Sequence, residues 1–161
     1  MIFEFPKKLE TEINRRIKNY PEKRSASLML LHAIQEHFGY ISSEAMEWIA
    51  QKLDLQPINV YELVTFYPMF RQEPVGKNVV KVCCTLSCAL SGSKELHGHI
   101  CKKLGVDAKA YGLQTSKDGQ FSIEFVECLA SCGTAPVMMC NDDFYEGVTL
   151  EQADEILESQ K

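Results

Sequence analysis

Apolar residues follow a helical period over the first part of the chain. Between residue 1 and about residue 75 they recur every three or four positions, with lysine, glutamate and arginine on the remaining faces. Leu9, Ile13 and Ile17 outline one helix. A second apolar stripe ends at Phe38, and Gly39 follows it in the position of a helix C-cap.

Two further helices are predicted before the period changes. Ser42 or Ser43 is placed to cap a third helix, and Pro57 suits the first turn of a fourth. Because the connections are short, neighbouring helices are expected to run antiparallel as a small bundle. The segment 71–77 contains turn residues and lacks periodicity, so we place a domain boundary there and expect domains at 1–75 and 76–161.

The second part of the chain alternates strands with helices. Short apolar runs predict strands at 78–84 and 137–140, and Phe121, Ile123 and Phe125 alternate with polar residues as in a half-buried strand. A helix is expected from Leu90 to Leu104, and Thr149 with Gln152 forms a capping box for a last helix. This order predicts a small mixed layer of the α/β or α+β class.

Composition and charge narrow the function classes. The 161 residues carry 17 lysines and arginines and 22 aspartates and glutamates, a formal charge of −5, so nucleic acid is a poor candidate partner. No apolar run reaches the length of a membrane span, and the N-terminus lacks the features of a signal or transit peptide. We therefore expect a protein that remains in the compartment where it is made.

Cysteine is the residue type in excess. All seven cysteines follow residue 82: Cys83, Cys84, Cys88, Cys101, Cys128, Cys132 and Cys140. Since the number is odd and no export signal is visible, a disulfide framework is disfavoured. Cys101 and Cys140 lie among apolar residues and are interpreted as core residues.

The spacing of the remaining thiols suggests a metal site. Cys83 and Cys88 form a C-x4-C pair directly after one predicted strand, and Cys128 and Cys132 form a C-x3-C pair directly after another. Strand ends lie side by side in a sheet, so the two loops can bring four thiolates together. Four soft ligands select zinc, copper(I) or an iron–sulfur cluster. The spacing alone does not decide between a zinc site, an iron–sulfur cluster and thiols that are unrelated to one another.

Longer motifs resemble a known family. They are LLHAIQEHFGYIS at Leu30–Ser42, NVYELVTFYPMFRQEPVG at Asn59–Gly76, VCCTLSC at Val82–Cys88 and ECLASCGTAPVM at Glu127–Met138. Together they resemble the thioredoxin-like [2Fe–2S] subunit of respiratory NADH:quinone oxidoreductase, complex I. The resemblance extends from about Ser27 to the C-terminal helix.

The resemblance implies a fold, a cofactor and a partner. It implies a helical bundle followed by a thioredoxin-like domain, with Cys83, Cys88, Cys128 and Cys132 holding one [2Fe–2S] cluster. It also implies a heterodimer with a flavoprotein subunit that binds FMN and NADH, within a larger bacterial assembly on the cytoplasmic side of the inner membrane. No direct membrane insertion is expected. The chain itself is expected to supply no NADH or FMN site and no catalytic residue, because no G-x-G-x-x-G follows a strand.

Several details of this interpretation can be checked in a structure. Cys84 also stands at C-x3-C spacing from Cys88, but Cys83 keeps the C-x4-C spacing and is taken as the ligand. Buried cluster charge requires N–H donors, which we expect from loops 85–87 and 129–131. Ala130 is expected to be crowded if its backbone has positive φ, and the Ser131 hydroxyl is a candidate donor to sulfur. Apolar neighbours are expected from Leu86, Leu129, Val137 and Met138.

Three alternatives stand beside the complex I interpretation. The resemblance fits equally a similar subunit of a NAD-linked hydrogenase or formate dehydrogenase. A zinc-stapled interaction module uses the same four thiolates. A thiol–disulfide enzyme normally needs a C-x-x-C at a helix N-terminus, which this chain lacks.

Overall fold

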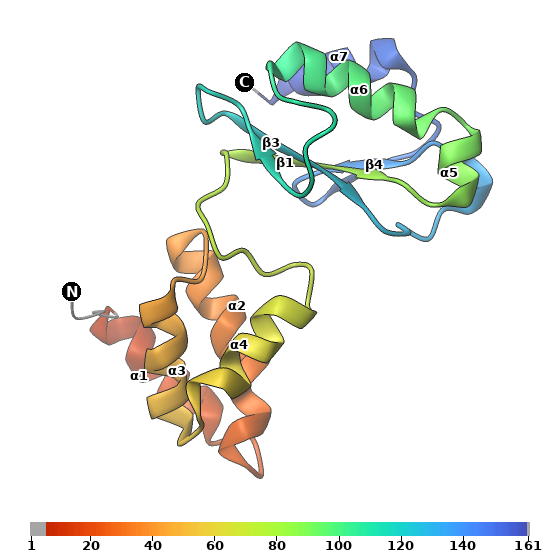
Figure 1. The fold of residues 1–161 in the computed structure, drawn as a ribbon. Helices are drawn as coiled ribbons and strands as arrows, with labels where there is room; N and C mark the ends of the chain where they lie inside the picture. Colours follow the sequence, from red (N-terminus) through yellow and green to blue (C-terminus); the bar gives the residue numbers. More distant parts are fainter. Residues whose placement is uncertain (1–5, 161) are drawn as a thin grey trace. The chain divides into compact units, whose positions relative to one another are not determined.

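A computed structural model describes residues 6–160, and the chain divides between Pro74 and Val75 into two compact units. Each unit has its own hydrophobic core. Figure 1 shows helices alone in the first unit and helices with a sheet in the second. The assignment of residues 1–75 and 76–161 as separate domains stays a prediction.

Over the described residues 6–74, the first unit contains four α-helices and a short 3-10 helix. They are α1 (Lys7–Ile17), η1 (Lys23–Ala26), α2 (Ser27–Phe38), α3 (Ser43–Leu53) and α4 (Pro57–Phe66). Local signals set their ends as expected. Gly39 closes α2 at φ 81°, Ser42 caps α3 by accepting from the Ala45 N–H at 3.2 Å, and Pro57 opens α4.

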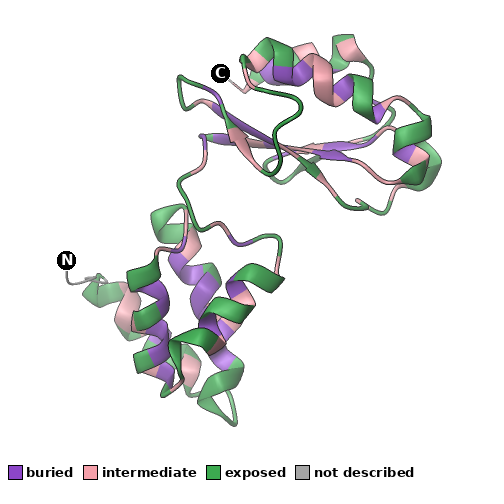
Figure 2. Cartoon of the chain, viewed as in Figure 1, coloured by how far each residue is buried: buried purple, intermediate pink, exposed green. Residues whose placement is uncertain are grey.

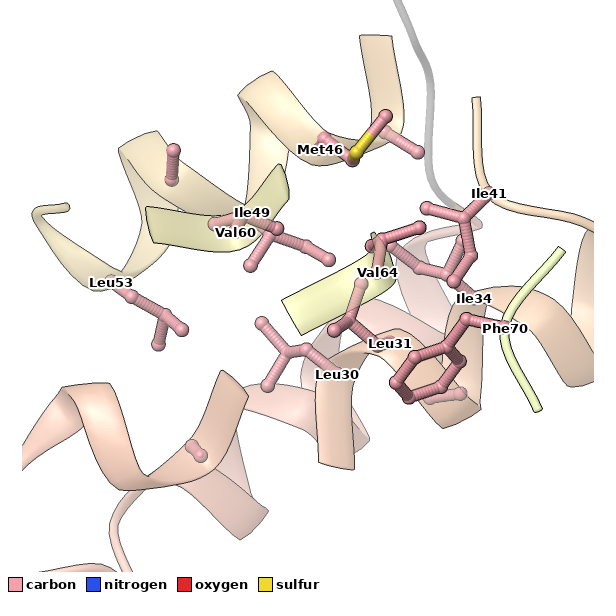
Figure 3. Packing of buried hydrophobic residues seen from close by; sticks show 14 of the residues in the cluster. Leu30, Leu31, Ile34, Ile41, Met46, Ile49, Leu53, Val60, Val64 and Phe70 are labelled. Atoms are coloured by element: carbon pink, nitrogen blue, oxygen red, sulfur yellow. The ribbon is translucent and has the colours of Figure 1, made fainter. Parts of the chain in front are cut away.

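The core of this unit is aliphatic. Leu30, Leu31 and Ile34 of α2 are fully buried, as are Ile49 of α3 and Val60 of α4. Figure 3 shows these side chains pointing toward one another, with the Phe70 ring at the edge of the cluster. In Figure 2 buried segments recur along the helices of the first unit and alternate with exposed ones, as the helical period predicts.

The second unit is a five-stranded sheet with helices. Its elements are β1 (Asn78–Cys83), α5 (Leu86–Leu90), α6 (Ser93–Leu104), β2 (Gln114–Thr115), β3 (Phe121–Val126), η2 (Cys132–Thr134), β4 (Met138–Cys140), β5 (Asp143–Tyr145) and α7 (Leu150–Ser159). The strand order is β2-β3-β1-β4-β5. Helices α6 and α7 lie together on one side of the sheet (Figure 1).

The sheet register brings the cysteine loops to one edge. Strands β1 and β3 are parallel, with Cys83 opposite Val126, so both strands end at the same edge. Strand β4 runs antiparallel to β1 and pairs Met138 with Val82, so it begins at that edge. The segments that follow β1 and β3 and precede β4 therefore meet there, and they contain both cysteine pairs.

Two expectations about the second unit are wrong in detail. Leu90 does not belong to the inner face of a long helix. It ends the short helix α5 at 81% exposure, and α6 starts separately after Gly92, whose φ of 92° breaks the helical path.

Strand β3 also departs from simple alternation. Phe125 is 38% exposed, whereas Ser122 is fully buried. Ser122 is buried because its hydroxyl accepts from the Gly76 N–H at 2.7 Å and lies 2.7 Å from the Thr115 hydroxyl. None of the helices within residues 6–160 combines the length and apolar character needed to cross a bilayer.

Candidate metal centre

The first cysteine pair is buried. Cys83 is the last residue of β1 and Cys88 lies in α5, and each is 2% exposed. Both pack against Val137, and their thiols hydrogen-bond with each other. The C-x4-C spacing thus closes a tight loop from the end of the strand into the first helical turn.

The second cysteine pair lies at the surface. Cys128 and Cys132 are exposed, and their Sγ atoms are 3.9 Å apart. Helix η2, which starts at Cys132, contacts α5, which holds Cys88, and Leu129 packs against the buried pair, so the exposed pair adjoins the buried one. All seven cysteines are free thiols. The structure therefore brings the four predicted site residues together, while their role as ligands stays a prediction.

Backbone N–H groups point at these sulfurs. The Thr85 and Leu129 N–H groups donate to Cys83, the Val137 N–H donates to Cys88, and the Ala130 N–H donates to Cys128 at 3.3 Å. The loops 85–87 and 129–131 supply three of the four, as expected. Val137 adds a donor that the sequence analysis did not foresee. N–H donors of this kind stabilise negative charge on thiolate sulfur.

The two buried thiols have pKa values that are shifted in opposite directions. Burial raises the pKa of Cys83, but donors from Thr85, Leu129 and the Cys88 thiol outweigh it and lower that pKa below its ordinary value. For Cys88, burial and the hydrogen bond with Cys83 outweigh the Val137 N–H and raise the pKa. Within the buried pair, Cys83 is therefore the thiol that ionises more readily.

Cys84 lies in different surroundings from Cys83. It lines a cavity of about 650 Å³ together with His97, Phe125 and Glu127, away from the cluster of Cys83, Cys88 and Val137. Burial, the Glu127 carboxylate and Cys83 raise the pKa of the Cys84 thiol. This placement favours Cys83, at C-x4-C spacing, over Cys84 as the partner of Cys88.

The loop that carries the second pair has a special backbone conformation. Ala130 has φ 64°, which confirms that this position needs the left-handed region, one that favours glycine. The Ser131 hydroxyl, expected to point at a sulfur, instead donates to Glu146. Thr134 Oγ1 donates to the same carboxylate at 2.5 Å. Both hydroxyls lower the pKa of Glu146, a residue that sequence spacing gave no reason to select.

The apolar surroundings agree with expectation at two of four positions, since Val137, which is 1% exposed, and Leu129 pack against the buried pair. Met138 is fully buried, but it belongs to the main core of the second unit and not to the cluster around Cys83 and Cys88. The expectation that Leu86 is an apolar neighbour of the site is wrong, because this side chain is 75% exposed in the first turn of α5. One wall of the site is therefore dry, and the side that carries Cys128 and Cys132 is open to solvent.

Cys101, Cys140 and the nearby histidines have packing, ring or ion-pair partners in the second unit. Cys101 and Cys140 are fully buried in the core of the second unit, as expected. His97 lies 3.5 Å from the Cys101 sulfur and its ring meets Phe125 at 4.0 Å, while His99 pairs with Asp154. Within residues 6–160, no three His, Cys, Asp or Glu side chains converge on a site for a single metal ion.

The donor set fits a [2Fe–2S] cluster. Such a cluster takes four thiolates, two for each iron, and needs hydrogen bonds to offset its negative charge. Here two cysteine pairs adjoin each other, and backbone N–H groups point at three of the four sulfurs. The chemistry that this donor set supports is one-electron transfer.

Comparison with known proteins agrees with this geometry. The sequence matches the thioredoxin-like [2Fe-2S] ferredoxin family over residues 13–161. It is 38% identical to an NADH-quinone oxidoreductase subunit from Aquifex aeolicus (strain VF5), over 96% of this chain and 94% of the relative. It is 39% identical to the protein of the same name from Rickettsia bellii (strain RML369-C), over 97% of this chain and 93% of the relative.

A solved structure shares the fold. Part of a NAD+-reducing [NiFe]-hydrogenase in its H2-reduced state aligns with a TM-score of 0.66 at 19% identity, covering 81% of this chain and 22% of that one. At this identity the likeness shows the fold alone. The family match covers almost the whole sequence, and the curated relatives are matched over nearly their full length. This chain belongs to the thioredoxin-like [2Fe-2S] ferredoxin family.

Proposed function

We propose that this chain is the electron-transfer subunit of an NADH:quinone oxidoreductase, with one [2Fe–2S] cluster held by Cys83, Cys88, Cys128 and Cys132. One observation carries the proposal. Two cysteine pairs adjoin each other at one edge of the sheet, and backbone N–H groups point at their sulfurs. A bound cluster would accept and release single electrons.

The residues around the thiols have distinct tasks in this proposal. The buried pair fixes one side of the site to the end of β1, where Val137 packs against both thiols and excludes water. The N–H groups of Thr85, Leu129, Ala130 and Val137 offset negative charge at sulfur. Cys128 and Cys132 lie at the surface, where a short path to a docked partner is available.

The partner in this proposal is a flavoprotein subunit. The sequence has no G-x-G-x-x-G after a strand, so we assign the NADH and FMN sites to that partner and no catalytic residue to this chain. The two would form a heterodimer within a larger assembly on the cytoplasmic side of the membrane. The curated relatives, which are named as NADH-quinone oxidoreductase subunits, support this choice of host complex.

A second host complex has a specific observation behind it. A NAD+-reducing [NiFe]-hydrogenase contains a region with the same fold, at a TM-score of 0.66. In that alternative the cluster keeps its electron-transfer role and the final acceptor differs. The near-complete alignment with the curated relatives favours the quinone-reducing assembly.

Co-expression with the flavoprotein subunit from the same genome tests the proposal. The two chains are expected to co-elute in gel filtration, and NADH added without oxygen should bleach part of the visible absorption that arises from this chain. A Cys83→Ser chain in the same preparation serves as the control, because it lacks one ligand while the flavoprotein is unchanged. A colourless chain with one zinc per molecule, or a cluster that NADH leaves oxidised in the complex, would contradict the proposal.

A further inference from the structure

The loop of the second cysteine pair is held by a carboxylate from another part of the chain. Ser131 directly precedes Cys132, and Thr134 follows it by two residues. The hydroxyls of both residues donate to Glu146 Oε1, the Thr134 contact at 2.5 Å, and the two hydroxyl oxygens are 2.8 Å apart. Glu146 thus contacts the loop on both sides of Cys132.

The position of Glu146 is fixed by the sheet. Strands β4 and β5 form an antiparallel pair in which Tyr145 lies opposite Met138, so Glu146 follows the last paired residue. Beyond it, the Gly147 N–H donates to the Thr134 carbonyl at 2.6 Å, and the Val148 N–H donates to the Pro136 carbonyl at 3.0 Å. The carboxylate is therefore presented from a backbone that is already bonded to the far end of the same loop.

Between Leu129, which packs against the buried pair, and Thr134, whose carbonyl accepts from Gly147, the loop lies at the surface. Cys128, Ala130 and Cys132 are exposed, and Ala130 is held at φ 64°, in the left-handed region that is strained for an alanine. Exposed segments with few buried contacts open easily. A short cluster of hydroxyl–carboxylate hydrogen bonds supplies a further restraint without burying apolar surface.

We propose that Glu146 is a positioning residue that holds the 128–134 loop, and with it Cys128 and Cys132, in the geometry that receives the cluster. The inference rests on the proposed function of the four cysteines. Glu146 touches neither the thiols nor a substrate in this account and acts only through the hydroxyls of Ser131 and Thr134. Groups that orient metal ligands in this way typically change metal retention by roughly 10- to 100-fold when removed.

Three variants of the full chain separate anchoring from charge. Glu146→Ala removes both the acceptor and the charge, Glu146→Gln keeps an acceptor oxygen and removes the charge, and Glu155→Ala removes an exposed carboxylate of α7 as the matched control. The measurement is the rate at which a ferrous chelator bleaches the dithionite-reduced protein. We expect Glu146→Ala to bleach roughly tenfold faster than wild type, and Glu146→Gln and Glu155→Ala to bleach at the wild-type rate.

A second measurement does not depend on the cluster. In iron-free chains, hydrogen exchange of the Thr134 and Gly147 amides reports on the loop, because these groups donate to the Ser131 and Thr134 carbonyls at 3.2 and 2.6 Å. Exchange should quicken in Glu146→Ala and stay at the wild-type rate in Glu146→Gln. Circular dichroism of each variant verifies that the fold is retained.

The outcomes distinguish this inference from the proposed function. If Glu146→Ala retains its cluster and its amide protection, or if Glu146→Gln behaves like Glu146→Ala, the anchoring role is wrong. If wild-type chain itself holds no iron and sulfide, the proposed function fails instead, and the exchange data still decide whether Glu146 anchors the loop.

Discussion

At the scale of single residues, the environment of each thiol decides what it can do. Cys83 and Cys84 are neighbours in sequence, yet one packs with Cys88 and Val137 while the other lines a cavity with His97 and Glu127. Burial raises the pKa of Cys83, but hydrogen bonds, first from the Thr85 hydroxyl at 3.3 Å and then from backbone N–H groups, outweigh it and lower that pKa. Burial and Glu127 raise the pKa of Cys84. Residue type alone could not separate them, because the direction of each side chain depends on the strand.

The ligand register gives the first prediction. Cys83→Ser is expected to lose the visible absorption and nearly all iron, because a hydroxyl replaces a thiolate at the buried end of the site. Cys84→Ser, its matched control one residue away, is expected to keep both. Iron analysis and absorption spectra of the purified variants measure the difference. The reverse pattern, with Cys84→Ser bleached and Cys83→Ser coloured, would show that the register is shifted.

Residue patterns predicted the four thiols and most of their N–H donors, but they did not predict the contact with Glu146. C-x4-C, C-x3-C and the strand ends identified four thiols that the structure brings together. The N–H donors from Thr85, Leu129 and Ala130 were also foreseeable, because tight loops after strands expose such groups. Glu146 was not foreseeable. Its contact with Ser131 depends on the pairing of β4 with β5, which no local motif encodes.

At the scale of elements, glycines and caps set the boundaries. Gly39 and Gly105 end helices at positive φ, and the Thr149–Gln152 capping box opens α7, as the sequence predicted. One continuous helix was expected from Leu90 to Leu104, whereas the structure has two helices between residues 86 and 104. They are separated at Gly92 because the chain must turn between the segment that holds Cys88 and the helix that covers the sheet.

A close backbone contact at the start of the second unit gives the second prediction. A Cβ added to Gly76 would lie 2.6 Å from the Phe121 carbonyl carbon and 2.9 Å from the Ser122 nitrogen. Gly76→Ala must therefore displace the backbone of β3 or break the 2.7 Å bond to the Ser122 hydroxyl. We expect a loss of about 1–3 kcal/mol in the free energy of unfolding, measured by denaturant titration.

The matched control for this variant is Gly98→Ala in α6, where an added Cβ meets nothing within 4 Å and the helix favours alanine. It should leave stability unchanged or raise it slightly. Equal stability of Gly76→Ala and wild type would mean that the two backbones do not approach as closely as described.

The contact between α6 and α7 gives a third, pH-dependent prediction. Asp154 accepts from Lys103 and His99 at 2.9 Å each, and Lys103 also lies 3.5 Å from Glu158. Lys103, followed by His99, lowers the pKa of Asp154. Folding is therefore favoured by this carboxylate at pH values above its unfolded pKa of about 3.9. The contribution is lost as the pH falls through the lower folded value.

Asp154→Asn should accordingly reduce stability at pH 7 by no more than about 1 kcal/mol, because the pair is largely solvated. In thermal melts of iron-free chain, the difference from wild type should shrink toward pH 3 and in high salt. A destabilisation that persists unchanged at low pH would assign the effect to packing rather than to charge.

At the scale of the whole molecule, each compact unit has its own core. The helical period, the change to strand-like runs and the turn-rich segment at 71–77 were sufficient to predict two parts and the mixed composition of the second. The strand order β2-β3-β1-β4-β5 was not predictable from those signals, because pairing between distant strands depends on long-range packing. It is this order that gathers the cysteine loops.

The most direct test of the central claim is the iron and acid-labile sulfide content of the full chain purified without oxygen. We predict two irons and two sulfides per chain, a red-brown colour, and an EPR signal of a single unpaired electron after dithionite reduction. A colourless protein with one zinc per chain, or iron without a matching amount of sulfide, would contradict the account.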